Sequence, residues 1–473
     1  MRKGFSLLFP ICILALLSFS TCSTTKEDDT RLYEGSGLVA IGDSITMGIQ
    51  DMGLVKDYQL KNFPYLIAEQ LGIAEAFEQP YVSPPGFGSP PFETPLKYEN
   101  GRIIANYIEG EIDRAALLQQ ILPLLENISL ERPYDNLGVG GAWLHDIRHT
   151  TSYENSVSPD NFLFDFVLRN FNPDFGNTTV LEQAIELEPT IILLWIGNND
   201  ILRAVLEGGD PSQITDATEF RNEFTVLLSE LRAGTEASIF MANIPGYLAF
   251  IHILDQIFQN NVPVLFDYET MQPINFGDGE GPLYIPLLTI EGSESDPVKY
   301  FNLYNIAGYI KEGLGIPAQQ DLIEMGLVAD ESEAEILFNA IQAAMDAAGV
   351  TMGTGVGNPF TENLTITESE YDDIKIAVEV FNGIIQDLSS QFEIPLVDIN
   401  YLWNPENEGA FSGYSGAFVL DDPENTVFSL DGVHPNNLGH AIIANAFLDK
   451  INEELQMGIP KLNPENFKGQ YAP

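Results

Sequence analysis

The chain has 473 residues, of which 69 are acidic and 21 basic, so its formal net charge at pH 7 is −48. Hydrophobic residues make up 45% of the chain and aromatic residues 11%. This composition is typical of a globular protein and excludes a chain that is disordered throughout. A surface this acidic repels phosphate backbones, so nucleic acid is not expected as a partner. Both cysteines, Cys12 and Cys22, lie near the N-terminus, which leaves the rest of the chain without a disulfide framework or a Cys-ligated metal site.

The N-terminus has the pattern of an export signal. Arg2 and Lys3 precede the apolar run Phe5–Phe19, and small polar residues then lead to Cys22. This pattern predicts a signal peptide over residues 1–21, followed by a polar tether at 22–36. Cys22 resembles the lipidated cysteine of a bacterial lipoprotein, which implies a lipid anchor in the outer membrane, on its periplasmic or its surface side. The alternative is ordinary secretory cleavage, with Cys22 as an accidental free thiol.

Short apolar runs alternate with helical patterns along the rest of the chain. Strands are predicted at 37–41, 190–196, 237–244 and 393–399, and helices at 61–72, 110–127, 216–232 and 439–455. Such alternation favours an α/β fold, with a parallel sheet covered by helices on both faces. The main domain is expected at 37–456, interrupted by an insertion or cap at about 246–357 that includes a helix at 332–348. A C-terminal tail follows at 457–473.

Two polar blocks near the ends of the main domain fit nucleophilic catalysis. Ser44 follows the first predicted strand, at the edge of the sheet where open α/β folds bind their ligands. A serine hydroxyl needs an imidazole to take its proton, and the imidazole needs a carboxylate on its other nitrogen. Asp431 and His434 stand three residues apart and can supply both groups. Taken alone, each block could instead be a structural turn.

Two further blocks lie between these ends. Residues 136–142 are rich in glycine, which lets backbone N–H groups approach a ligand closely, and they include Gly141. Asn199 lies in the block Gly-Asn-Asn-Asp that follows the run at 190–196, so it is expected at the same sheet edge as Ser44. A side-chain amide in that place can donate to a developing oxyanion.

Together the four blocks resemble the SGNH/GDSL hydrolase family of esterases and lipases, in the order Gly-Asp-Ser, Asn-x-x-x-x-Gly, Gly-x-Asn-Asp and Asp-x-x-His-Pro. The resemblance implies a three-layer α/β/α sandwich with a flavodoxin-like parallel sheet, and no metal or cofactor. It implies that Ser44 is the nucleophile of a triad with Asp431 and His434. The oxyanion donors would be the backbone N–H groups of Ser44 and Gly141 and the side chain of Asn199. The Gly-x-Ser-x-Gly elbow of the competing serine-hydrolase fold does not occur.

The resemblance implies a serine hydrolase that cleaves carboxylic esters, as a lipase or esterase acting on acyl esters through an acyl-enzyme intermediate. One alternative is a deacetylase of acetylated polysaccharide, and another is a non-catalytic surface-binding lipoprotein on the same scaffold. The apolar segment Tyr247–Phe258 could form an acyl pocket, a lid or a buried cap helix. Its His252 is expected in the core.

Two other features remain open at this stage. His145 and His149 follow the block that contains Gly141 and could reach the cleft or lie at the surface. Asp278 and Glu280 could hold Ca²⁺, but they lack the spacing of an EF-hand, so a solvated loop is expected.

Overall fold

The computed structural model describes residues 37–246 and 313–469, except 91, 100–101, 105, 107, 109–113, 159–160, 173–175, 325, 348–352, 406 and 418–421, and only five short strands between 247 and 312. Several predictions lie outside the described residues. They concern the signal peptide and tether with Cys22, most of the apolar segment 247–258 with His252, and the loop with Asp278 and Glu280. Within the described part, no helix is both long and apolar enough to cross a membrane.

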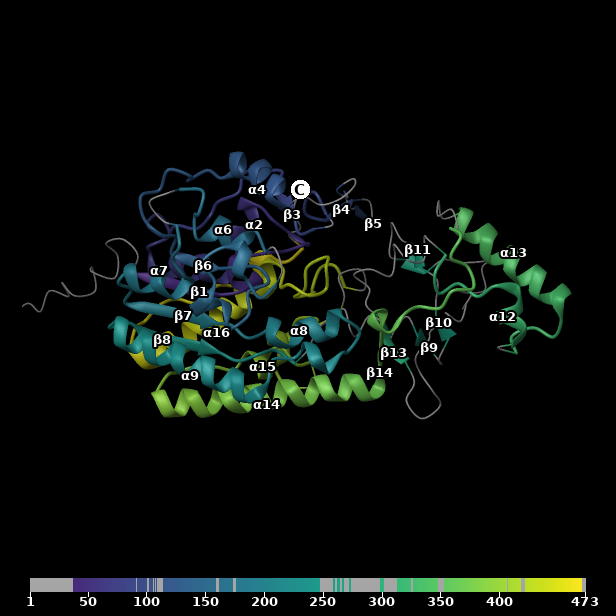
Figure 1. Ribbon diagram of the computed structural model, residues 1–473. Helices are drawn as coiled ribbons and strands as arrows, with labels where there is room; N and C mark the ends of the chain where they lie inside the picture. The colour runs from purple at the N-terminus through teal and green to yellow at the C-terminus, as the bar shows by residue number, and fades with distance from the viewer. Residues whose placement is uncertain are drawn as a thin grey trace, which may run out of the picture.

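A five-stranded parallel sheet forms the centre of the protein (Figure 1). Its strands, in spatial order, are β15 (Leu396–Val397), β8 (Ser238–Ala242), β7 (Ile191–Trp195), β1 (Leu38–Gly42) and β6 (Asn136–Gly138). Counted along the chain, this is the order 5-4-3-1-2, which is the flavodoxin-like order 2-1-3-4-5 read from the other edge. The register places Gly42 opposite Gly138 on one side and Trp195 on the other. The predicted fold class is confirmed.

The sheet is buried on both faces because its central strands are continuous apolar runs. All five residues of β1 and all five of β7 are buried. Alternate residues of β1 enter two separate cores, Val39 and Ile41 in one and Leu38 and Ala40 in the other. The first core includes residues of α7 (Val180–Glu186), α9 (Ala217–Gly234) and α14 (Glu368–Phe392), and the second includes residues of α3 (Phe63–Leu71) and α16 (Asn437–Leu455). Helix, sheet and helix therefore form the three layers.

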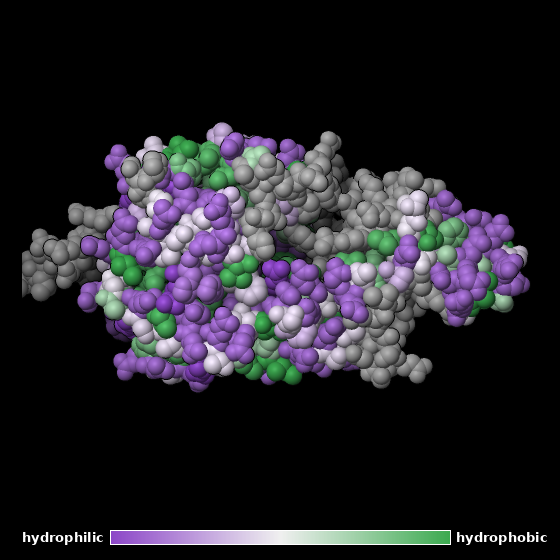
Figure 2. Space-filling view, viewed as in Figure 1, coloured by the Kyte–Doolittle hydropathy of each residue, from purple (hydrophilic) through white to green (hydrophobic). Residues whose placement is uncertain are grey.

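The remaining helices and strands lie between these elements along the chain. On the N-terminal side they are α1 (Ser44–Met47), β2 (Gly53–Leu54), α2 (Lys56–Gln59), β3 (Phe87–Gly88), β4 (Lys97–Glu99), β5 (Arg102–Ile104), α4 (Arg114–Ile121), α5 (Asp146–His149), α6 (Leu163–Val167) and α8 (Asn199–Leu206). After β8 come β9 (Phe258–Gln259), β10 (Val262–Pro263), β11 (Phe266–Asp267), β12 (Gln272–Pro273), β13 (Val298–Phe301), α12 (Gln319–Glu324), α13 (Glu331–Ala347), β14 (Thr365–Thr367) and α15 (Ile399–Leu402). In Figure 1, α12 and α13 lie well to one side of the central sheet. Figure 2 shows hydrophilic residues over most of the visible face, including the surface of α13.

The predicted boundaries differ from the structure by more than two residues in two elements. The strand predicted at 393–399 is only Leu396–Val397, because Asp398 accepts a hydrogen bond from the Tyr401 N–H at 3.0 Å and begins α15. The helix predicted at 110–127 ends at Ile121 and continues as the 3₁₀ turn Leu122–Leu124, which contains a proline. Neither β6 nor the 25-residue helix α14 was predicted. The domain boundaries remain predictions.

Candidate active site

Ser44 begins α1 directly after β1, at the carboxyl end of the sheet. Asp43 caps this short helix by accepting a hydrogen bond from the Ile45 N–H at 3.0 Å. Gly42 permits the close approach of β1 and β7 at this point, since a Cβ atom at this position would lie 2.5 Å from the Trp195 carbonyl oxygen. Strand order reverses between β1 and β7, and open α/β sheets bind ligands at such a point. Ser44 therefore stands where the topology predicts a binding crevice.

Two residues from the C-terminal part of the chain reach Ser44. Nε2 of His434 lies 2.9 Å from Oγ of Ser44, although 390 positions separate the two residues. Nδ1 of His434 lies 2.9 Å from Oδ2 of Asp431. The side chains of His434 and Asp431 are 10% and 2% exposed. The structure thus brings together a hydroxyl, an imidazole and a carboxylate in a continuous hydrogen-bonded chain.

Backbone donors hold the carboxylate of Asp431 in place. Oδ1 accepts hydrogen bonds from the N–H groups of Val433 and His434, both at 2.8 Å. Oδ2 accepts from the Met52 N–H, also at 2.8 Å, in addition to facing His434 Nδ1. Since every lone-pair direction of the buried carboxylate has a donor, Asp431 is held in one orientation.

The Met52 donor belongs to a tight turn that the sequence did not reveal. Gln50 and Gly53 exchange both backbone hydrogen bonds, at 3.0 and 2.9 Å, around Asp51 and Met52. Asp51 and Met52 have φ of 53° and 57°, in the left-handed region that residues other than glycine rarely adopt. The Asp51 carboxylate accepts a hydrogen bond from the Leu430 N–H at 2.7 Å. The turn therefore also fixes the backbone just before Asp431.

Burial and neighbouring charges shift the pKa values of the site. Burial acts to raise the pKa of Asp431, but His434 and the N–H donors outweigh it and lower the pKa to about 2. For His434, burial acts to lower the pKa, but the Asp431 carboxylate outweighs burial and raises it. Burial raises the pKa of Asp43 to about 6 and that of Asp51 to about 7. The carboxylate of Asp431 therefore favours a protonated His434, the form this imidazole takes after accepting a proton from serine.

The block after β7 reaches the same place. Nδ2 of Asn198 donates to the Asp43 carboxylate at 2.7 Å, which joins the ends of β7 and β1. Asn199 begins α8, lines the cleft beside Ser44 and donates through Nδ2 to the Ala142 carbonyl oxygen at 2.9 Å. Gly141, with φ of 75°, precedes that carbonyl but is not among the described residues that line the cleft.

The cleft beside Ser44 is mainly apolar and small. Its described lining includes Ile201, Val205, Ile374, Val378, Trp403 and Val433. Its volume is about 60 Å³. For comparison, one ordered water molecule needs roughly 10–15 Å³. Ile374 and Val378 come from α14, which sequence reasoning missed. The sequence did carry a signal for α14, because Thr367 and Glu370 form a capping box at its start.

The remaining histidines of the described part lie elsewhere. His440 is buried, accepts a hydrogen bond from the Phe63 N–H at 3.3 Å on Nδ1, and has a pKa lowered to about 3 by burial. His145 and His149 do not line the cleft, but stack on each other with ring centroids 4.2 Å apart. Within the described residues, they and Glu223 are the group whose ligand atoms lie close enough to hold a metal ion.

The chain is similar to one known family and, more weakly, to solved structures. A family model described as GDSL-like Lipase/Acylhydrolase matches residues 38–274. No curated protein matches the chain. Among solved structures, LAE5, an alpha/beta hydrolase enzyme from the metagenome of Lake Arreo in Spain, is 12% identical, with 89% of this chain and 97% of that chain covered and a TM-score of 0.32. A variant of Axe2, an acetyl xylan esterase from Geobacillus stearothermophilus, is also 12% identical, with 91% and 99% covered and a TM-score of 0.32.

Proposed function

The chain belongs to the family of GDSL-like lipases and acylhydrolases and acts on esters, and on this premise we propose that Ser44, His434 and Asp431 are its catalytic triad. The observation that carries the proposal is the hydrogen-bonded chain from Ser44 Oγ to His434 Nε2 and from His434 Nδ1 to Asp431, with 2.9 Å at each step. Acyl transfer to serine requires a hydroxyl nucleophile, an imidazole base and a carboxylate that orients the imidazole, and these three residues supply them.

The reaction proceeds in two halves. His434 Nε2 takes the proton of Ser44 as Oγ bonds to the ester carbonyl carbon, and Asp431 stabilises the resulting imidazolium. His434 then gives this proton to the leaving alcohol oxygen as the carbon–oxygen bond breaks, which leaves an acyl group on Ser44. In the second half, His434 deprotonates a water molecule that attacks the acyl carbon. The acid departs and Ser44 regains its proton.

The oxyanion formed in each half is stabilised by N–H donors. These are the backbone N–H group of Ser44 and the side-chain amide of Asn199, two residues that line the cleft, and the backbone N–H group of Gly141, whose role rests on the family resemblance alone. The assignment of Asn199 is supported by its position in the cleft beside Ser44. An amide nitrogen carries two N–H groups, so Asn199 can donate to the Ala142 carbonyl and to a substrate oxygen at the same time.

The substrates are esters of short acyl groups. The described part of the cleft has a volume of about 60 Å³, room for about four to six waters at roughly 10–15 Å³ each. An acetyl or butyryl group is of this size, whereas a palmitoyl chain is far larger. The apolar side chains Ile201 and Val378 suit the hydrocarbon end of such a group.

The enzyme is anchored in the bacterial outer membrane through a lipid on Cys22. The support is the sequence alone, in which an export signal ends at this cysteine. Cys22→Ser should move the activity from the membrane fraction to the soluble fraction and abolish labelling of the protein by an alkyne-tagged fatty acid. Labelling that persists in the variant would overturn the anchor at this position.

The decisive experiment compares wild type with Ser44→Ala on p-nitrophenyl esters from acetyl to palmitoyl. We expect the wild type to favour the short esters and the variant to lose activity. A fluorophosphonate should also label Ser44, since an activated serine displaces its fluoride, and mass spectrometry locates the adduct. Activity retained in Ser44→Ala would reject the triad, and a preference for palmitoyl would reject the short acyl site. A chain that neither hydrolyses these esters nor takes the label would favour the non-catalytic binding alternative.

A further inference from the structure

A cluster of ligand-type side chains lies outside the catalytic cleft, between α5 and α9. His145 precedes α5, His149 ends it, and Glu223 lies in α9. One ligand atom from each of these three residues lies within 4.8 Å of the other two. We propose that His145, His149 and Glu223 bind a divalent transition metal ion such as Zn²⁺. The proposal is independent of the proposed catalytic triad, since none of the three residues lines the cleft beside Ser44.

The geometry of the cluster suits a single ion. The two histidines are four positions apart, which places them on one side of a helical turn. Nε2 of His149 lies 3.1 Å from Oε2 of Glu223. Two ligands of one Zn²⁺, each about 2.0–2.2 Å from the metal, are separated by about 3.0–3.5 Å. The imidazole of His145 stacks on that of His149 at 4.2 Å, so a small rotation brings its nitrogen to the same ion.

The chemistry of the donors selects the kind of metal. Two imidazoles and one carboxylate suit Zn²⁺, Ni²⁺ and Cu²⁺, whereas Ca²⁺ and Mg²⁺ prefer sites made of oxygen ligands alone. The side chains of His149 and Glu223 are 41% and 21% exposed, so an ion can enter from solvent and keep water as its remaining ligands. The two imidazole ligands distinguish this site from the many surface carboxylates of a chain with a net charge of −48.

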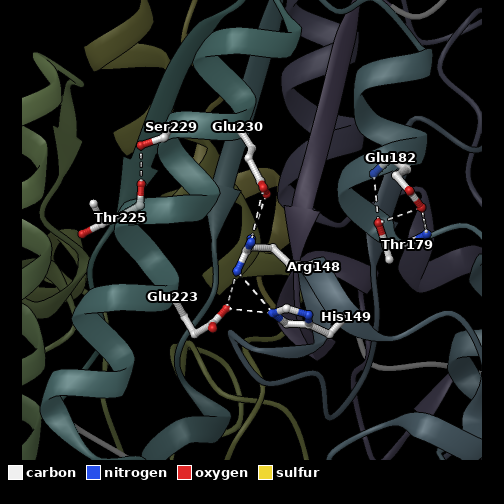
Figure 3. Close-up of polar contacts among 8 residues, drawn as sticks. All are labelled: Arg148, His149, Thr179, Glu182, Glu223, Thr225, Ser229 and Glu230. Atoms are coloured by element: carbon white, nitrogen blue, oxygen red, sulfur yellow. Dashed lines mark hydrogen bonds and ion pairs between the residues drawn. The ribbon is translucent and has the colours of Figure 1, made fainter.

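The Arg148 guanidinium competes with a metal ion for the carboxylate of Glu223. Figure 3 shows its guanidinium between Glu230 and Glu223, with His149 beside Glu223. Nη1 lies 2.7 Å from Glu223 and 3.2 Å from Nε2 of His149, whereas Nε lies 2.8 Å from Glu230. Arg148 can therefore keep its pair with Glu230 while Glu223 turns to a metal ion. The Glu223 carboxylate already attracts the singly charged Arg148, and its Coulomb attraction for a doubly charged ion at the same distance is larger.

The position of the site predicts its effect on the protein. α5 follows the loop that contains Gly141 and Ala142, and α9 packs against the central sheet. An ion shared by His149 and Glu223 ties that loop to the helical layer. Because it binds the folded chain, it should raise the Tm, and the rise should increase with metal concentration.

The test is calorimetric titration of the mature chain, residues 22–473, with ZnCl₂, in a background with Cys22→Ser so that no thiolate competes. We expect one ion per chain and a rise in Tm. His149→Ala and Glu223→Gln should each weaken binding by more than about tenfold, since even loss of an outer partner of a ligand costs that much. Arg148→Gln should strengthen binding by removing the competing cation.

Glu219→Gln is the matched control, because it removes an equal charge from the same helix one turn away without removing a ligand. It should leave the affinity for Zn²⁺ within about twofold of wild type. Excess MgCl₂ should not displace the bound zinc. Equal losses in Glu219→Gln and Glu223→Gln, or unchanged binding in His149→Ala, would overturn the site and assign the zinc to the acidic surface.

Discussion

Replacing the triad carboxylate by an amide, Asp431→Asn, tests the proposed mechanism most directly. The carboxylate accepts four hydrogen bonds, from the N–H groups of Met52, Val433 and His434 and from His434 Nδ1. An asparagine side chain offers one acceptor oxygen and one donor NH₂ group. If its oxygen keeps the contacts with Val433 and His434, its NH₂ group faces two former donors, the Met52 N–H and His434 Nδ1.

Both conflicts have a calculable cost. The buried Met52 N–H loses its acceptor, which should lower the free energy of unfolding by about 1–3 kcal/mol. Nδ1 of His434 must become an acceptor, so the proton moves to Nε2, the atom that has to take the proton of Ser44. In the equivalent change in a chymotrypsin-type triad, the wrong tautomer lowers kcat by about 10⁴-fold, and we expect a loss of the same order.

The assay is steady-state hydrolysis of p-nitrophenyl acetate at pH 8, with urea unfolding on the same preparation. kcat should fall and KM should stay close to the wild-type value, because Asp431 does not line the cleft. Asp216→Asn is the control, since Asp216 caps α9 at the surface and asparagine caps a helix equally well. A folded Asp431→Asn variant with kcat within tenfold of wild type would refute the role of Asp431.

Four further outcomes are expected. Asn199→Ala should lower kcat by about 10²–10³-fold through loss of an oxyanion donor, and unchanged turnover would remove Asn199 from that role. The raised pKa of His434 means that the neutral base forms only above the usual histidine range, so kcat/KM should increase with pH. A midpoint at or below about pH 6.5 in a profile from pH 5 to 9 would contradict this reasoning. Val378→Phe narrows the cleft and should reduce hydrolysis of p-nitrophenyl butyrate more than that of the acetate, and an unchanged ratio would place the acyl group elsewhere. Phe220→Ala removes a fully buried ring stacked on Phe381 and should cost about 3–5 kcal/mol in urea unfolding, whereas a loss below about 1 kcal/mol would show that the cavity collapses.

The main features of the fold and of the candidate site were readable from local patterns. The continuous apolar run at 190–196 predicted a central parallel strand, because a strand buried on both faces has no polar alternation, and 237–244 was predicted as another strand. Polar residues that follow such runs were expected at one sheet edge, since parallel strands end on the same side. Ser44 and Asn199 do line one cleft there. The chain order of the four blocks supplied the family.

Other features depended on contacts that no local pattern encodes. β6 has only three residues, which is too short for a periodic signal. Helix α14 began with a readable capping box, but its contribution to the cleft wall arises from packing. His145 and His149 were recognisable as a pair, whereas Glu223, their neighbour in space, was not.

The sequence by itself determined which residue types follow each strand, and hence the fold class and the candidate reacting groups. Only the tertiary structure decided how those groups are oriented. The Met52 N–H holds Asp431 across 379 positions, from a turn in which Asp51 and Met52 adopt left-handed backbone angles. Such angles are unfavourable for these residues in isolation, and they persist because the surrounding contacts compensate their cost. Side-chain orientation at this site is therefore a property of long-range packing, which short-range sequence patterns do not contain.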